Sequence, residues 1–114
     1  MTLEQPGADK RKFSRIPFKR TVKYRLDINQ EPIAESSQDL CQGGLRIRSN
    51  EFIPVGQILE VGVQLVDSGE VVRLPARVKW VRYNPYSESY QLGLEFEQGD
   101  LYPLSRISRF LSNS

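Results

Sequence analysis

The chain is 114 residues long, the size of a single domain, and 39% of its residues are hydrophobic, a proportion typical of a folded protein rather than a disordered one. It has no histidine and one cysteine, so it lacks the commonest general base and metal ligand and cannot form an internal disulfide, which favours a reducing, cytoplasmic setting without a metal site. Its net charge is only +2, although the segment near the N-terminus is strongly basic. No apolar run is long enough for membrane insertion.

The N-terminal region divides into a polar tail and a basic segment. Residues 1–9 are polar and contain Pro-Gly, and we expect them to be disordered. Residues 10–25, KRKFSRIPFKRTVKYR, contain eight lysines and arginines and no acid. Such a block is typical of a surface that binds phosphate, nucleic acid or an acidic membrane, although a solvated tail has the same composition. Arg11 and Arg15 are spaced so that two guanidiniums can converge on one anion.

From residue 21 to residue 98 the dominant period is two, which predicts strands with one buried face, as in antiparallel sheets and barrels. The predicted core-facing sets are Val22, Tyr24, Leu26 and Ile28; Leu45 and Ile47; Leu59, Val61, Val63 and Leu65; Val72, Leu74, Ala76, Val78 and Trp80; and Tyr90, Leu92, Leu94 and Phe96. Turn signals separate these segments. We predict a mainly β fold of about six strands, closed into a small barrel or folded as a sandwich, because closure removes exposed strand edges.

The C-terminal segment has a different period. Its apolar residues, Leu101, Leu104, Ile107 and Leu111, follow helical spacing, with Ser108 as an alternative to Ile107. Asp100 is placed to cap the first turn. The spacing predicts a short helix over residues 100–112 that covers the barrel.

The turn between the second and third predicted strands, DLCQGG, contains the only cysteine and the only Gly-Gly pair of the chain. The Asp39 carboxylate could accept hydrogen bonds from the N1–H and N2–H₂ groups of a guanine, or it could orient an arginine. Gly43 and Gly44 permit positive φ and let the backbone approach a ligand. Cys41 has no partner cysteine, so a redox role is disfavoured.

Together these features resemble the PilZ domain family. The family signature is R-x-x-x-R in the N-terminal segment, here RKFSR, followed by [D/N]-x-S-x-x-G between two strands, here DLCQGG. The strand ARVKWVR and the segment YQLGLEF extend the resemblance over residues 10 to about 111. It implies a PilZ domain over residues 10–114: an arginine-containing segment at 10–20, a six-stranded antiparallel β-barrel at 21–98 and the C-terminal helix. The implied ligand is cyclic di-GMP, a bacterial second messenger.

The resemblance also implies roles for the basic segment. Arg11 and Arg15 would hold the phosphates and guanine edges of one cyclic di-GMP molecule or of an intercalated dimer. Lys10 would add a phosphate contact. Trp80 would pack against the ligand, although its place at the end of a core-facing set predicts a core position instead.

In the turn, Asp39 would bind the Watson–Crick edge of a guanine, and Gly44, beside Gly43, would leave room for the base. Cys41 is the departure from the signature, because it stands where the family has serine. A thiol is a weaker hydrogen-bond donor than a hydroxyl, and losing one bond to a charged group is worth about 1–3 kcal/mol. We therefore expect weakened, but not abolished, binding.

Three functions follow from these observations. The first is a cytoplasmic cyclic di-GMP receptor, without a cofactor, that changes a surface read by an unidentified protein effector. The second is an adaptor that keeps the barrel and acts through protein contacts without nucleotide, which the serine-to-cysteine change favours. The third, a small-barrel nucleic-acid binder, is disfavoured because most aromatic residues fall on core faces. An enzyme is disfavoured because no paired carboxylates and no nucleophile beside a base are found.

Overall fold

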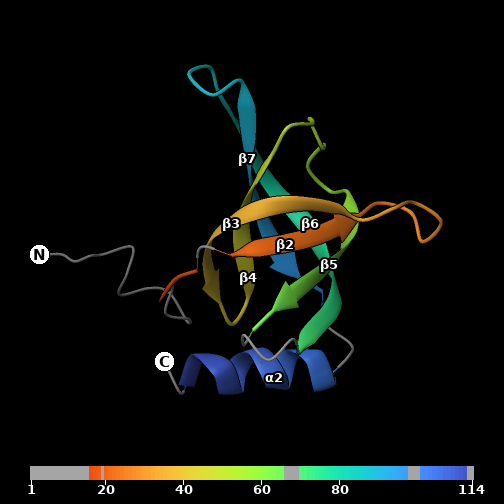
Figure 1. The fold of residues 1–114 in the computed structure, drawn as a ribbon, viewed down its shortest axis with the longest axis vertical. Helices are drawn as coiled ribbons and strands as arrows, with labels where there is room; N and C mark the ends of the chain where they lie inside the picture. Colours follow the sequence, from red (N-terminus) through yellow and green to blue (C-terminus); the bar gives the residue numbers. More distant parts are fainter. Residues whose placement is uncertain (1–15, 19, 66–69, 98–100, 113–114) are drawn as a thin grey trace, which may run out of the picture.

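The computed structural model describes residues 16–18, 20–65, 70–97 and 101–112. In these ranges the elements are β1 (Ile16–Pro17), β2 (Thr21–Arg25), β3 (Ile33–Cys41), β4 (Gly44–Ser49), β5 (Ile58–Gln64), β6 (Val71–Asn84), β7 (Ser89–Phe96) and α2 (Leu101–Ser112). Figure 1 shows the strands wrapped around one core, with α2 below them and the β6–β7 hairpin extending away from the helix. The predicted tail at 1–9 lies outside the described residues.

The strands form one antiparallel sheet that closes on itself. The neighbours run in the order β3-β2-β5-β6-β7-β4, and β4 pairs again with β3. The two-residue β1 pairs with Asp39 and Leu40 of β3, on the edge of β3 that β2 occupies over Ile33 to Ser36. The predicted six-stranded antiparallel barrel is therefore confirmed, and closure leaves each of its long strands with two neighbours.

The core follows the predicted alternation over most of its length. In β5 every second residue is buried, so that Leu59, Val61 and Val63 face inwards while the residues between them face solvent. The inward residues of the other strands are Val22, Tyr24, Leu40, Leu45, Ile47, Val72, Leu74, Ala76, Val78, Leu92, Leu94 and Phe96. A small barrel has room for these side chains and little else.

The prediction for Leu26 and Ile28 is wrong, because both side chains are exposed. The strand ends at Arg25, and a turn follows in which the amide of Asn29 donates to Asp27 Oδ1 at 3.0 Å. This local bond satisfies the backbone within the turn, so period-two spacing no longer determines which side chains are buried.

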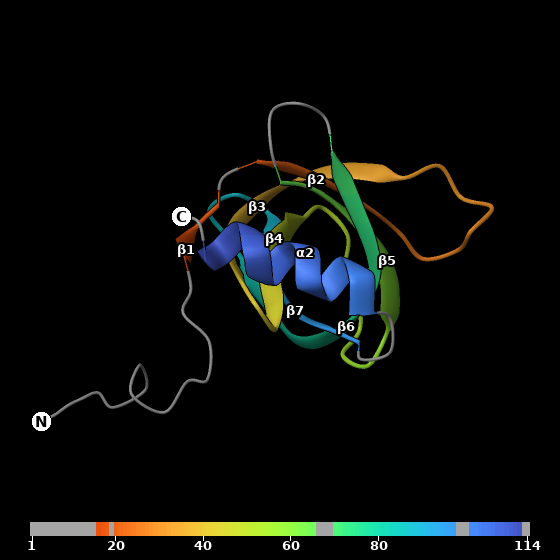
Figure 2. The same ribbon diagram turned by 90° about the horizontal axis from the view of Figure 1, so that it is seen from below.

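The C-terminal helix covers one end of the barrel, as Figure 2 shows from below. Ile107 is fully buried in the core, and Leu104, Phe110 and Leu111 pack partly against it. The predicted helix at 100–112 is thus found at Leu101–Ser112, and the proposed cap at Asp100 lies outside the described residues. No helix in the ranges given above is long and apolar enough to cross a membrane.

Candidate functional site

The β3–β4 hairpin, which contains the DLCQGG sequence, is held tightly against β7. Cys41 pairs with Gly44 across the turn, and the amide of Phe96 donates to the Gly43 carbonyl at 2.8 Å. A Cβ at Gly44 would lie 1.9 Å from the carbonyl oxygen of Leu94. Gly44 is therefore required by the close approach of two backbones, a reason that the sequence did not reveal. Among the described glycines, positive φ occurs at Gly56 rather than in this hairpin.

Cys41 lies at the end of β3 with its side chain buried. Its exposed fraction is 5%, and it forms no disulfide. The thiol is therefore largely shielded from solvent. Burial restricts access of oxidants to the sulfur, in agreement with the expectation that a redox role is disfavoured.

Asp39 is paired with an arginine on the neighbouring strand. Its Oδ2 lies 2.8 Å from Arg46 Nη2, and the two residues are direct partners in the β3–β4 ladder. A register shift between Ser37 and Asp39 precedes this pair. The arginine-orienting role considered for Asp39 thus has a specific partner. Arg46 is not part of the predicted site, although its outward position on β4, seven residues after Asp39, is a signal present in the sequence.

Asp39 and Arg46 belong to a row of four directly paired residues that crosses the outer face of the barrel. Arg46 pairs with Gly93 on β7, and Gly93 pairs with Trp80 on β6. The indole lies over the glycine, because a Cβ at Gly93 would lie 2.1 Å from Trp80 Nε1. We call Asp39, Arg46, Gly93 and Trp80 the outer row.

The predicted core position of Trp80 is wrong. A register shift between Val78 and Trp80 adds one residue to β6, which reverses the faces of the residues that follow. Trp80 is 36% exposed, and Val81 packs against the core in its place. The guanidinium of Arg82 lies 5.5 Å from the Trp80 ring centroid. The tryptophan is therefore available on the surface, as its implied ligand contact requires.

The start of the described chain lies beside this hairpin. In β1, which directly follows Arg15 in the sequence, Ile16 pairs with Leu40 and Pro17 pairs with Asp39. The Ser37 hydroxyl donates to the carbonyl of Phe18 at 2.5 Å and fixes the end of this segment on β3. Lys10, Arg11 and Arg15 lie outside the described residues.

Two contacts connect this region with the helix. Gln42 Nε2 in the hairpin donates to Ser108 Oγ at 3.0 Å. Phe18 packs edge-to-face on Phe110, with 5.8 Å between ring centroids. The hairpin and the segment after β1 therefore both touch the C-terminal half of α2. No group of three or more His, Cys, Asp or Glu side chains in the described ranges could hold a metal ion.

The closed barrel and the helix that covers one of its ends define a small, mainly β domain. The family model "PilZ domain" matches residues 9–113. The chain belongs to the PilZ domain family, whose members are binding and receptor domains and are generally not enzymes.

Solved structures with this fold have low sequence identity to the chain. The Bacillus subtilis inhibitor of motility MotI/DgrA is 16% identical with a TM-score of 0.73, over 91% of this chain and 50% of that one. The complex of K. pneumonia MrkH with c-di-GMP is 17% identical with a TM-score of 0.72, over 91% and 52%. The PilZ domain of Escherichia coli YcgR with c-di-GMP is 14% identical with a TM-score of 0.67, over 91% and 90%.

The chain thus spans about half the length of the first two of these proteins. At such identities the likeness establishes the fold. A comparison with curated protein sequences gives no match.

Proposed function

We propose that this protein is a non-enzymatic cyclic di-GMP receptor that acts in the cytoplasm and passes the signal to a protein effector. The observation that carries the proposal is the position of β1 beside the signature hairpin. Pro17, two residues after Arg15, pairs with Asp39, which begins the DLCQGG sequence. The chain that directly follows the RKFSR half of the family signature therefore pairs with the strand in which the DLCQGG half begins.

The arginine segment supplies the positive charge for the ligand. Arg11 and Arg15 hold the phosphates and guanine edges, and Lys10 adds a phosphate contact. A guanidinium presents a planar pair of donors that fits phosphate oxygens or the O6/N7 edge of guanine. Binding of the anionic ligand neutralises the positive charge of this segment and favours the conformation in which it contacts the ligand.

The outer row supplies the surface for the bases. Asp39 holds Arg46 by the 2.8 Å ion pair, so that either the carboxylate or the oriented guanidinium meets a guanine. Trp80 offers an exposed ring on which a base can stack, because Gly93 beneath it has no side chain. Gly43 and Gly44 keep the hairpin narrow beside this surface.

Cys41 lowers the affinity for cyclic di-GMP. A thiol is a weaker hydrogen-bond donor than the serine hydroxyl of the family signature, and burial of Cys41 limits its contact with the ligand. We therefore expect binding weaker than a serine at this position would give. Cysteine in place of the signature serine also favours a second function, that of an adaptor that acts through protein contacts without nucleotide.

The helix provides a route from ligand to effector. Gln42 in the hairpin contacts Ser108, and Phe18 contacts Phe110. Ordering of the arginine segment acts directly on these contacts, because Phe18 is three residues from Arg15 in the chain. A change in α2 then alters a surface that a partner protein can recognise.

Isothermal titration calorimetry with cyclic di-GMP tests the receptor function, with GTP and cyclic GMP as ligand controls. We expect heat of binding with the wild type and loss of it in Arg11→Ala and Arg15→Ala. Arg109→Ala, which removes an exposed cation on α2, is the matched control and should bind like the wild type. The absence of heat at high micromolar cyclic di-GMP with the wild type would refute the receptor and favour the adaptor.

A further inference from the structure

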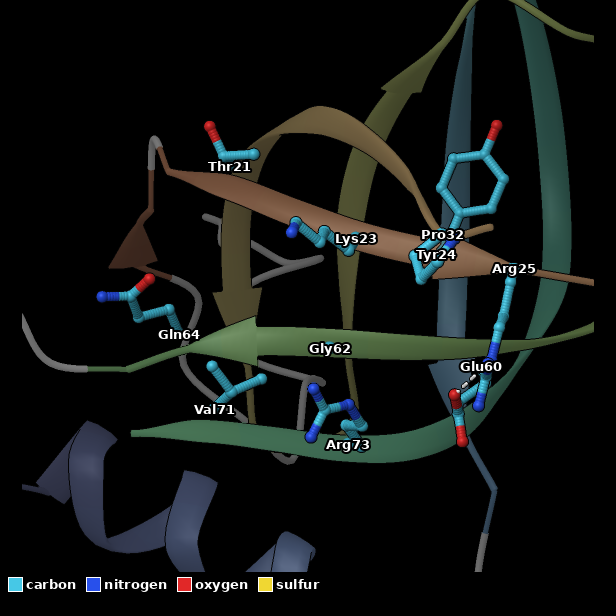
Figure 3. A pocket seen from close by; sticks show the side chains of 10 residues that line it. All are labelled: Thr21, Lys23, Tyr24, Arg25, Pro32, Glu60, Gly62, Gln64, Val71 and Arg73. Carbon is cyan, nitrogen blue, oxygen red and sulfur yellow. Dashed lines mark hydrogen bonds and ion pairs between the residues drawn. The ribbon is translucent and has the colours of Figure 1, made fainter. Parts of the chain in front are cut away.

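A groove lies on the outer face of β2, β5 and β6 and has a volume of about 200 Å³. Figure 3 shows it from outside, with Lys23 on one side of Gly62 and Arg73 on the other. In the barrel order, β5 is three strands from β4 in either direction. The groove is therefore on the opposite side of the barrel from Arg46 on β4, and it shares only the strand β6 with the outer row, whose Trp80 lies further along that strand.

Lys23, Gly62 and Arg73 form one row across this groove. Gly62 pairs directly with Lys23 on β2 and with Arg73 on β6. Adjacent strands are about 4.8 Å apart, so the two cationic residues stand roughly 10 Å apart at their backbones, and their long side chains can meet over the glycine. An anionic group placed above Gly62 would be within reach of both.

Among the described residues, no acid forms an ion pair with either cation of this row. In the next row Arg25 Nε lies 2.7 Å from Glu60 Oε1, so that this arginine and this glutamate compensate each other. In the described ranges no ion pair joins Lys23 or Arg73 to a carboxylate. The groove therefore has two cations ready for an anion from outside.

Gly62 is not explained by the barrel itself. Its φ is not positive, and a Cβ there would meet Val71 Cγ1 at 3.4 Å, an ordinary contact. Gly44 and Gly93 differ, since a Cβ would lie 1.9 Å and 2.1 Å from its nearest neighbour. A glycine inside a strand weakens the strand. Glycine at position 62 keeps the bottom of the groove free of a side chain.

The rim of the groove indicates the kind of anion. Val71 and Pro32 are exposed and add apolar surface beside the two cations. A free phosphate would leave this apolar rim in water, whereas a peptide can cover the rim and place a carboxylate on the cations. Apolar surface combined with arginine is typical of protein interfaces.

We propose that the groove over Gly62 is a docking site for an acidic segment of a partner protein, with an Asp or Glu carboxylate between Lys23 and Arg73. This inference rests on the proposed adaptor function, for which it supplies the recognition surface. Arg20, the last residue of the arginine-containing segment at 10–20, connects that segment with this groove, because its Nη1 donates to the Leu65 carbonyl at 3.1 Å, just after β5.

The test is an amide NMR titration of the full chain with N-acetyl-hexaglutamate amide, and with N-acetyl-hexaglutamine amide as the uncharged control. We expect saturable shifts at the amides of Lys23, Gly62 and Arg73 with hexaglutamate only. The double variant Lys23→Ala/Arg73→Ala should weaken this binding at least tenfold. The matched control Lys79→Ala/Arg109→Ala loses the same charge elsewhere and should change the affinity less than twofold.

Gly62→Val separates the groove from the net charge, because it fills the bottom of the groove and keeps both cations. The affinity for hexaglutamate, measured from the shifts of these amides, should fall at least fivefold. The other amide signals should remain those of the folded protein. Shifts confined to other residues, equal shifts with hexaglutamine, or equal weakening in both double variants would overturn the proposal. The proposal would also be overturned if inorganic phosphate shifted the same amides with an affinity equal to that of the peptide, because the groove would then be a site for small anions.

Calorimetry with cyclic di-GMP on the same variants distinguishes the two proposals. Lys23→Ala/Arg73→Ala and Gly62→Val should keep the wild-type affinity for the nucleotide. Nucleotide binding without groove binding would refute only the docking site. Groove binding without nucleotide binding would refute only the receptor function and leave the docking site supported.

Discussion

Trp80 on β6 lies over Gly93 on β7, so close that a Cβ at position 93 would lie 2.1 Å from the indole Nε1. Gly93→Ala should therefore displace the indole outwards without disturbing the backbone. Trp80 is the only tryptophan, so its fluorescence reports this position alone. We expect a red shift of the emission maximum in the variant, because the ring becomes more exposed to water.

The control for this prediction is Gly62→Ala, which has room for a Cβ and should leave the emission unchanged. Far-UV circular dichroism should show the same barrel in all three proteins. An emission maximum that does not move in Gly93→Ala would contradict the close packing of ring and glycine. If Trp80 contacts the ligand as proposed, cyclic di-GMP should also change its emission.

The ion pair of Asp39 and Arg46 should matter more for ligand binding than for stability. The Arg46 side chain is 38% exposed and the Asp39 side chain 13% exposed, and an ion pair with one partner open to solvent is screened and contributes on the order of 1 kcal/mol to stability. A double-mutant cycle with Asp39→Ala and Arg46→Ala in urea should give a coupling energy in this range. Each single variant should weaken cyclic di-GMP binding at least tenfold, about 1.4 kcal/mol, because the pair presents the polar groups of the outer row.

The matched control is the ion pair of Arg77 and Glu97, at 3.1 Å, which lies outside the outer row. Arg77→Ala should change stability by a similar amount and leave nucleotide affinity unaltered. If Asp39→Ala and Arg77→Ala changed the calorimetric affinity for cyclic di-GMP equally, this result would argue against a binding role for Asp39.

Cys41→Ser should strengthen nucleotide binding and weaken the fold. A serine hydroxyl is the better donor, and one recovered hydrogen bond to a charged group corresponds to about tenfold or more in affinity. Burial of the hydroxyl at a position with 5% exposure should reduce the free energy of unfolding by about 1–3 kcal/mol unless it finds a partner. Calorimetry and urea unfolding measure the two effects on the same variant.

Cys41→Ala is the control, because it removes the sulfur without adding a donor. Its affinity should not exceed that of the wild type. Identical affinities of the serine and alanine variants would show that the side chain at this position does not meet the ligand.

Two glycines of the barrel should respond oppositely to alanine. Gly44→Ala brings a Cβ to 1.9 Å from the Leu94 carbonyl oxygen, so backbone must move, and overpacking of this kind costs about 1–3 kcal/mol or more. Gly62→Ala meets only ordinary contacts and removes the flexibility of a strand glycine, which should stabilise the protein by about 0.5–1 kcal/mol. Thermal unfolding compares the two directly, and a stabilised Gly44→Ala would refute the packing account.

The regular part of this fold could be predicted from sequence because burial alternates where strands pair without interruption. In β5 the predicted inward residues Leu59, Val61 and Val63 are buried; in β7 Leu92, Leu94 and Phe96 are buried, and Tyr90 packs partly against the core. Trp80 could not be placed in this way. An added residue in β6 reverses the faces of the strand after Val78, and nothing in the period of ARVKWVR marks where the addition occurs.

The candidate site was predictable only where a motif marks it. Asp39 and Gly44 belong to a recognisable turn, whereas Arg46 and Gly93 come from other strands and join the outer row through barrel closure. Such neighbours depend on strand order and register, which the sequence pattern leaves open. The groove over Gly62 could not be predicted for the same reason, because Lys23 and Arg73 come close together only when β2, β5 and β6 are neighbours in the sheet.

Tyr24 should make the barrel sensitive to alkaline pH. Its side chain is 1% exposed inside the barrel, and its hydroxyl lies 3.0 Å from Ser49 Oγ. Burial disfavours the charged phenolate and raises the pKa of Tyr24 above its ordinary value of 10.0. The unfolded chain therefore loses this proton at lower pH than the folded chain. The stability contributed by Tyr24 is complete below pH 10 and is lost as the pH rises through the folded-state pKa.

Urea unfolding of the wild type and of Tyr24→Phe between pH 7 and pH 11 tests this prediction. Tyr24→Phe should cost about 1 kcal/mol at neutral pH through loss of the hydrogen bond, and its stability should fall less steeply above pH 10. Tyr86→Phe, at an exposed tyrosine, should keep the wild-type pH dependence. Parallel pH profiles for all three proteins would contradict the assignment, because the alkaline loss would then arise from groups other than the buried phenol.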